Sequence, residues 1–170
     1  MKPQLFAAFL AAAVPEPSGY WTGPNQGEVP DTVAGGTVIH TEVLAGMVRH
    51  GKPVLIDVSP LPPPPPELPP GTVWMPPPHR DIPGSVWLPE AGRGELPASA
   101  DEFYRTRLKS LTGGDAGRAV VLYCHPHCWL SWNAAKRAAS YGYRSVYWYP
   151  DGVEGWEEAG HGTAETKPER

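Results

Sequence analysis

Apolar runs alternate with amphipathic stretches along this chain. Residues 54–58 and 119–123 are apolar at nearly every position, and residues 145–149 repeat the pattern with aromatic side chains. An uninterrupted run of this length predicts a strand that is buried on both faces, as in a parallel sheet. Residues 38–40 and the end of the segment 81–89 predict two further short strands.

Between these runs the apolar positions follow a helical period. The pattern predicts helices over 42–50, 99–111 and 130–141, and a glycine follows each of them. Thr41 is expected to cap the first helix, and residues 99–102 have the sequence of a capping box for the second. Strands that alternate with helices form βαβ units, so we expect an α/β domain with a central parallel sheet flanked by helices.

Proline marks the segments outside this core. The 23 prolines include an unbroken run at 62–66, so residues 59–80 are expected to form a Pro-rich insertion of polyproline II or irregular coil after the second strand. The insertion is either a stiff surface loop or a docking surface for a partner. Residues 14–36 are expected to be extended and residues 161–170 to form a flexible tail, which leaves a single domain over 37–160.

The first 13 residues have the pattern of a secretory signal peptide. A positive charge at Lys2 precedes an apolar stretch over 5–13, which ends in three alanines that resemble a cleavage site. The stretch is too short to span a bilayer, so we expect export, cleavage near Val14 and no membrane span in the mature protein. The formal net charge of −4, with no Lys/Arg cluster, argues against a nucleic-acid partner.

Both cysteines lie in one loop between the predicted strand 119–123 and the predicted helix 130–141. The loop reads Cys124-His125-Pro126-His127-Cys128 and is followed by Trp129. A cysteine at such a turn meets backbone N–H groups and the positive end of a helix, and both favour thiolate over thiol. Because parallel sheets bind ligands beyond the carboxyl ends of their strands, we interpret the loop as the candidate site.

The residue types in the loop are compatible with more than one function. A Cys124–Cys128 disulfide would close a very short loop and add little stability, so it would act as a redox device or local clamp. Cys124, His125, His127 and Cys128 are also ligand types that suit Cu or Zn. Five consecutive residues rarely wrap around one ion, so we expect no metal or other cofactor and interpret the histidines as tuning the thiolate.

Four motifs together resemble the rhodanese-like domain family. They are Leu55-Ile56-Asp57-Val58, Asp81-Ile82-Pro83-Gly84-Ser85, Val120-Val121-Leu122-Tyr123-Cys124 and Gly152-Val153-Glu154-Gly155-Trp156. More narrowly, residues 128–137 and 146–150 resemble the exported rhodanese-like proteins that are named for a Cys…Cys-Trp motif and associated with PQQ-dependent catabolism. The resemblance implies a rhodanese fold over about 37–160.

The resemblance, together with the residues of the loop themselves, suggests roles for individual residues. Cys124 corresponds to the nucleophile that carries a sulfane sulfur, and Cys128 would be its resolving or disulfide partner. The substrate-binding candidates are His125, His127, Trp129 and Ser131. Asp57 would support the loop. The implied partners are a small sulfur donor or thiol acceptor and, through the narrower resemblance, a PQQ-dependent dehydrogenase or its cytochrome partner in the periplasm.

The chain departs from the pattern of active sulfurtransferases at several positions. No Arg or Lys occurs in the loop, Ser59 stands where Arg usually follows the second strand, and Asp81 replaces the usual His before Ile-Pro-Gly. These departures weaken the case for plain thiosulfate sulfur transfer. They favour, as an alternative, an inert binding module that holds a Cys124–Cys128 disulfide and docks a partner through its Pro/Trp-rich surface.

Overall fold

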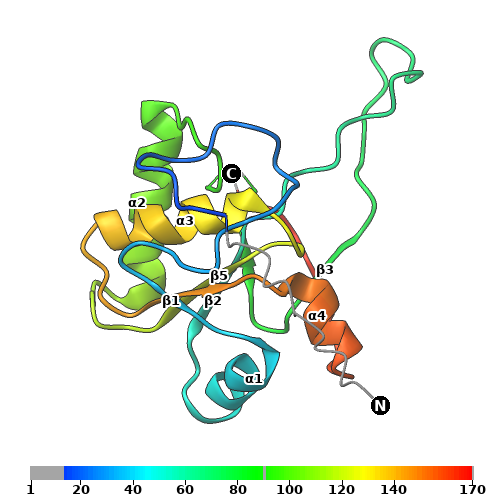
Figure 1. The fold of residues 1–170 in the computed structure, drawn as a ribbon. Helices are drawn as coiled ribbons and strands as arrows, with labels where there is room; N and C mark the ends of the chain where they lie inside the picture. Colours follow the sequence, from blue (N-terminus) through cyan, green and yellow to red (C-terminus); the bar gives the residue numbers. More distant parts are fainter. Residues whose placement is uncertain (1–13, 90, 170) are drawn as a thin grey trace, which may run out of the picture.

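A parallel sheet of five strands, in the order β1-β6-β5-β2-β4, forms the centre of the molecule (Figure 1). The computed structural model describes residues 14–89 and 91–169, so the predicted signal peptide at 1–13 lies outside the described residues. The elements are β1 (Thr37–Val38), α1 (Thr41–His50), β2 (Val54–Asp57), β3 (His79–Asp81), β4 (Val86–Trp87), α2 (Ala98–Thr112), β5 (Val120–Tyr123), α3 (Trp129–Ser140), β6 (Val146–Tyr149), α4 (Gly152–Glu158) and β7 (Ala164–Thr166).

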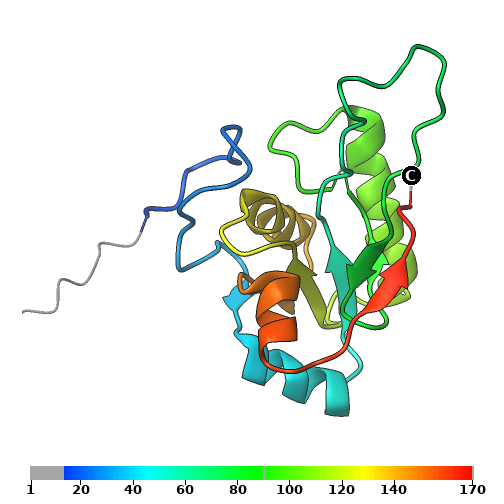
Figure 2. The same ribbon diagram turned by 90° about the vertical axis from the view of Figure 1, so that its right-hand side faces the viewer.

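Helices cover both faces of the sheet (Figure 2). Along β2, Ile56 packs into the cluster that contains α2 and α3, while its neighbour Leu55 packs into the cluster that contains α1 and α4. Every residue of β2 and β5 is buried, which is why both strands appear in the sequence as continuous apolar runs. The predicted α/β fold with a central parallel sheet is confirmed.

The helices lie within one residue of their predicted positions, but two of them start differently. Neither α1 nor α2 has a side-chain cap, so the caps predicted at Thr41 and at 99–102 are wrong. At α1 the helix already includes Thr41, whose N–H donates to the Asp151 carboxylate at 3.1 Å. The end of α2 is as predicted, with Gly113 in the left-handed region. No helix in the described part of the chain has the length and apolar character needed to cross a membrane.

The Pro-rich insertion extends from the body as a long loop (Figure 1), with Val73 and Met75 highly exposed. The coil expected over 59–80 ends early, because His79–Asp81 forms β3. This strand pairs antiparallel with β7, which lies in the segment expected to be a flexible tail. The two strands are three residues long and carry polar side chains, so they leave no apolar pattern in the sequence.

Candidate functional site

The loop 124–128 joins the carboxyl end of β5 to the first turn of α3. Cys124 follows β5 directly, Cys128 is the residue before α3, and their exposed fractions are 0% and 2%. The loop is fixed to α4 through its backbone, since Val153 N–H donates to the carbonyl of Cys124 at 3.1 Å. The structure therefore places both thiols inside the protein, at the edge of the sheet where the sequence predicted a site.

The two thiols interact, and their pKa values move in opposite directions. A hydrogen bond from the side chain of Cys124 is the main reason why the pKa of Cys128 falls to about 7. Backbone N–H groups of Leu130, His125 and Ser131 also stabilise this thiolate, although Cys128 forms no regular helix cap. Burial, together with the neighbouring Cys128, raises the pKa of the Cys124 thiol well above its usual value. The thiolate of the pair therefore lies on Cys128, and Cys124 is its hydrogen-bond donor.

The assignment of the thiolate to Cys128 differs from the sequence interpretation, which assigned the reactive thiolate to Cys124. The physical reason is the position of the helix. Because α3 begins at Trp129, Cys128 is the residue at its positive end, while Cys124 lies deeper and is surrounded by the core. A helix start predicted one residue earlier would have pointed to Cys128.

Ser59 reaches the cysteine pair from the end of β2. Its hydroxyl donates to the sulfur of Cys124 at 3.6 Å, and its backbone N–H donates to Asp57 Oδ1 at 2.6 Å. Asp57 thus acts on the loop through Ser59. Among the hydrogen bonds of the described residues, none joins Asp57 directly to either cysteine. In the sequence Ser59 was visible only as the residue that replaces an expected Arg.

Asp57 also belongs to a buried cluster with His79 and Asp81. The Nε2 atom of His79 lies 2.6 Å from Asp57 Oδ2 and 3.0 Å from Asp81 Oδ1, and the ring of His79 stacks on Trp87. Burial raises the pKa of Asp57 to about 6. Burial opposes the charge on His79, but its interactions with the two neighbouring carboxylates raise its pKa to about 9. Sequence reasoning missed His79, because it lies in the segment read as proline-rich coil.

The two loop histidines are held by separate partners. His125 Nδ1 lies 2.6 Å from Glu154 Oε1 on α4. His127 adopts a left-handed backbone with φ of +56°, and its carbonyl accepts from Gly27 N–H at 3.0 Å. Within the described residues, the Cys and His side chains of the loop do not gather into a group that could hold a metal ion. The weak metal alternative suggested by Cys124, His125, His127 and Cys128 gains no support from this arrangement.

Residues 21–27, here called the strap, lie across the loop and beside α3 (Figure 2). Trp129 N–H donates to Asn25 O at 2.8 Å, and Trp21 stacks on Trp129 with ring centroids 4.4 Å apart. The strap therefore packs against the end of the loop and the start of α3, next to Cys128. The sequence predicted that this segment is extended but held no local signal of where it packs.

The two remaining substrate-binding candidates have structural contacts. Trp129 is buried between Trp21 and Trp132. Ser131 donates to the carbonyl of Cys128 at 3.2 Å and accepts from the indole N–H of Trp148 at 3.0 Å. Both residues fix the start of α3 beneath the strap.

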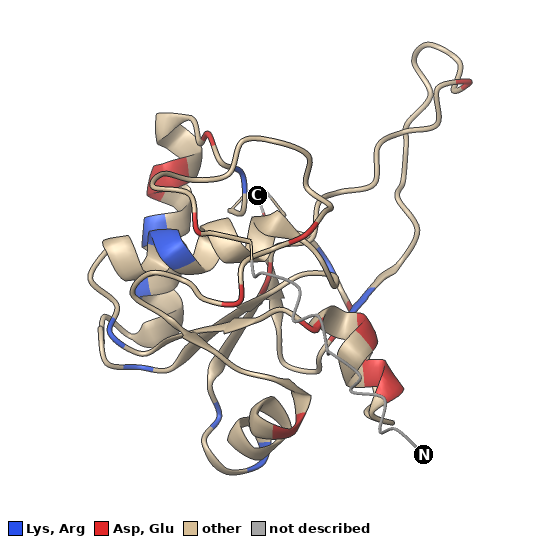
Figure 3. Ribbon diagram, viewed as in Figure 1, with Lys and Arg blue, Asp and Glu red and all other residues tan. Residues whose placement is uncertain are grey.

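Neither the loop nor helix α4 supplies a Lys or Arg side chain for an anionic substrate. The sequence contains no Lys or Arg from 119 to 135. Helix α4, which packs against the loop, carries acidic residues and no basic ones (Figure 3). Anions such as thiosulfate are normally bound by Arg or Lys through charge-assisted hydrogen bonds, so these surroundings favour a neutral substrate.

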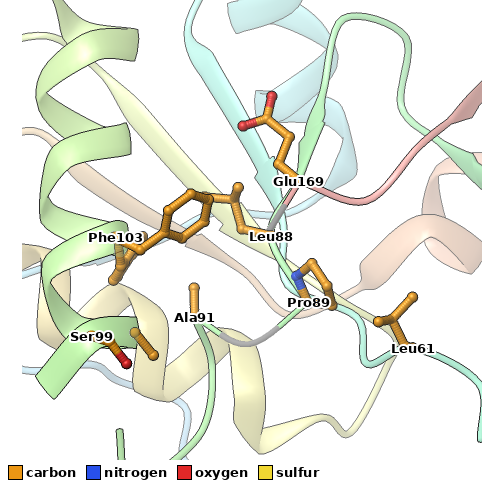
Figure 4. Close-up of a pocket in the computed structure, with 9 residues that line it drawn as sticks. Leu61, Leu88, Pro89, Ala91, Ser99, Phe103 and Glu169 are labelled. Carbon is orange, nitrogen blue, oxygen red and sulfur yellow. The ribbon is translucent and has the colours of Figure 1, made fainter. Parts of the chain in front are cut away.

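An apolar hollow of about 460 Å³ lies elsewhere, between the Pro-rich insertion and α2 (Figure 4). Leu61, Leu88, Ala91 and Phe103 form part of its wall. None of the side chains that line it is a cysteine or histidine. The hollow therefore offers mainly apolar surface, without a thiol or an imidazole in its lining, and the candidate thiol chemistry stays with the loop.

Two comparisons with known proteins bear on this arrangement. Residues 40–159 match the family model described as rhodanese-like domain. The match includes the cysteine loop and every element from α1 to α4. No curated protein matches the chain.

Proposed function

Because the chain belongs to the rhodanese-like family, we propose that it performs thiol chemistry, specifically thiol–disulfide exchange at the Cys124–Cys128 pair with Cys128 as the attacking thiolate. One observation carries the proposal: two buried thiols are hydrogen-bonded to each other, and the pKa is lowered at Cys128 alone. A thiol with a pKa near ambient pH combines a large thiolate fraction with good nucleophilicity.

The first step is attack on a disulfide RSSR. The Cys128 thiolate bonds to one sulfur of the substrate, the S–S bond breaks, and RS⁻ leaves and takes up a proton. In the second step the Cys124 thiol gives its proton to solvent and its sulfur attacks Cys128. The Cys124–Cys128 disulfide forms, and the second RS⁻ leaves and is protonated. The protein dithiol is oxidised by two electrons, and RSSR is reduced to two RSH.

Two features of the site support this sequence of steps. The spacing of four residues allows the Cα separation that a disulfide requires. The hydroxyl of Ser59, 3.6 Å from Cys124 Sγ, is placed to stabilise the thiolate that forms there in the second step. A sulfane-sulfur donor would follow the same route, with a persulfide on Cys128 as the intermediate and HS⁻ as the second leaving group.

Trapping of the first intermediate tests the proposal. In Cys124→Ser the second step cannot occur, so treatment with 2-hydroxyethyl disulfide should leave one hydroxyethylthio group on Cys128. The reduced wild-type protein should instead lose the mass of two hydrogens and retain no adduct. Peptide mass mapping reads both results. An adduct that stays on the wild-type protein would contradict the proposed roles. So would an adduct that forms on Cys124 in the Cys128→Ser variant while none forms on Cys128 in the Cys124→Ser variant.

We propose further that the protein works in the periplasm as an accessory to a PQQ-dependent oxidation system. The apolar pattern of residues 1–13 and the resemblance of 128–137 and 146–150 support this assignment. A dithiol that cycles through a disulfide also suits an oxidising compartment. The partner would be a PQQ-dependent dehydrogenase or its cytochrome. The protein should be recovered in the periplasmic fraction with Val14 as its first residue by N-terminal sequencing, and recovery only in the cytoplasmic fraction with Met1 retained would count against export.

A further inference from the structure

The geometry points to a second site: Asp57, His79 and Asp81 form a binding site for a divalent transition-metal ion of the Zn²⁺ type. Their ligand atoms, one from each residue, all lie within 4.8 Å of one another. Both carboxylates are fully buried, and the side chain of His79 is 15% exposed. Among the described residues this is the one group of Cys, His, Asp and Glu side chains with such convergence.

The hydrogen bonds within the cluster leave one carboxylate oxygen without a hydrogen bond of its own. His79 Nε2 donates its proton to Asp57 Oδ2, and the two atoms are 2.6 Å apart. Asp81 Oδ1 is 3.0 Å from the same nitrogen, yet it is buried and accepts no hydrogen bond. A buried carboxylate oxygen without a partner is costly. A cation at the centre of the cluster would bind this oxygen together with Asp57 Oδ2 and His79 Nε2.

The charges in the cluster favour a divalent ion over a proton. Two ionised carboxylates and one imidazolium leave a net charge of −1 inside the protein. A divalent cation in place of the imidazolium proton leaves the two carboxylates and a neutral imidazole around a charge of +2, so the sum is zero. Uncompensated charge in the interior is disfavoured. The cluster is therefore better balanced around a metal ion than around a proton.

The outer oxygens of both carboxylates are held by other groups, as is usual around metal ligands. Asp57 Oδ1 accepts from Ser59 N–H at 2.6 Å, and Asp81 Oδ2 accepts from Thr166 Oγ1 at 2.7 Å. Trp87 stacks on the His79 ring and fixes its plane. These contacts orient one oxygen of each carboxylate and one imidazole nitrogen toward the common centre.

The ligand types select the class of metal. Mg²⁺ and Ca²⁺ prefer oxygen ligands alone, whereas an imidazole with carboxylates suits Zn²⁺ and its transition-metal neighbours. Three protein ligands also leave one position of a tetrahedral site for water. His79 borders a hollow formed with Trp74 and Trp87, which provides a route for the ion from solvent.

Titration with Co²⁺ tests the site, because cobalt reports its ligands in its absorption spectrum. Reduced wild-type protein should bind one Co²⁺ per chain, displaced by Zn²⁺, without the intense near-ultraviolet band that cysteine thiolate ligands produce. Asp81→Asn keeps the shape of the side chain but removes its charge, and it should weaken binding by at least about tenfold. Circular dichroism confirms that the variant is folded.

Asp151→Asn is the matched control. It removes the carboxylate from the exposed His40–Asp151 pair, where the two atoms are 2.8 Å apart and no second carboxylate is present, so Co²⁺ affinity should not change. Failure of the wild-type protein to bind Co²⁺ would overturn the proposal, whether or not the Asp81 variant folds. Binding that shows the thiolate band and survives Asp81→Asn would overturn it as well. Neither outcome affects the cysteine chemistry, which needs no metal.

Discussion

Replacement of Cys128 by serine should slow the reaction of the reduced protein with a small disulfide at pH 7 by about tenfold or more. With a pKa of about 7, roughly half of Cys128 is thiolate at this pH. Cys124, the thiol that remains, has a pKa raised well above 9.0, mainly by burial that the substitution does not relieve. Its thiolate fraction is therefore below about 1%, and its greater intrinsic nucleophilicity offsets only part of that difference.

Cys124→Ser is the matched comparison for this rate. It replaces the thiol whose hydrogen bond is the main cause of the low pKa at Cys128 by a shorter hydroxyl group, and it leaves the backbone N–H groups at the start of α3. The initial reaction should therefore slow less than in Cys128→Ser. Stopped-flow measurement of the first step in both variants gives the order of the two rates. If Cys124→Ser is the slower variant, the thiolate has been assigned to the wrong cysteine.

The substitution Gly152→Ala should destabilise the protein by about 3 kcal/mol or more. Gly152 has φ of +68°, and a Cβ atom there would lie 2.7 Å from the backbone carbon of His125 and 2.8 Å from the carbonyl oxygen of Cys124. Both neighbours are backbone atoms of the cysteine loop, so relief of the overlap would require the loop to move. Urea denaturation of the reduced protein measures the loss of unfolding free energy.

Gly113→Ala separates the two contributions to this loss of stability, which are backbone strain and steric overlap with the loop. Gly113 has nearly the same φ, +66°, but a Cβ atom there would meet nothing within 4 Å. This substitution should cost only the backbone strain, about 1–2 kcal/mol. Equal losses at the two positions would mean that the contact between α4 and the loop is not tight.

The part of the fold that could be predicted from the sequence is the part with a local signal. β2 and β5 are buried on both faces, so nearly every residue in them is apolar and the strands are visible without any partner. β3 and β7 stabilise each other across a large separation in sequence and use polar side chains. Local patterns cannot reveal such a pair, and the tail was therefore read as flexible.

In the candidate site, too, only the features with a local sequence signal could be predicted. Two cysteines between a buried strand and a helix predicted where the candidate site lies. Which of them is the thiolate depends on a contact between two thiols and on a helix that starts one residue earlier than expected. The strap and His79 reach the site from distant parts of the chain, and neither left a local signal in the sequence.

The central claim is that Cys128, and not Cys124, is the thiolate of the pair. The most direct test is a pH titration of the reduced protein, monitored by NMR of cysteine labelled at ¹³Cβ. The chemical shift of this carbon reports conversion of thiol to thiolate at each residue separately. The structure predicts that the Cys128 resonance titrates with an apparent pKa of about 7, while Cys124 remains a thiol up to at least pH 9. Titration of Cys124 near pH 7, with Cys128 still protonated, would contradict the account.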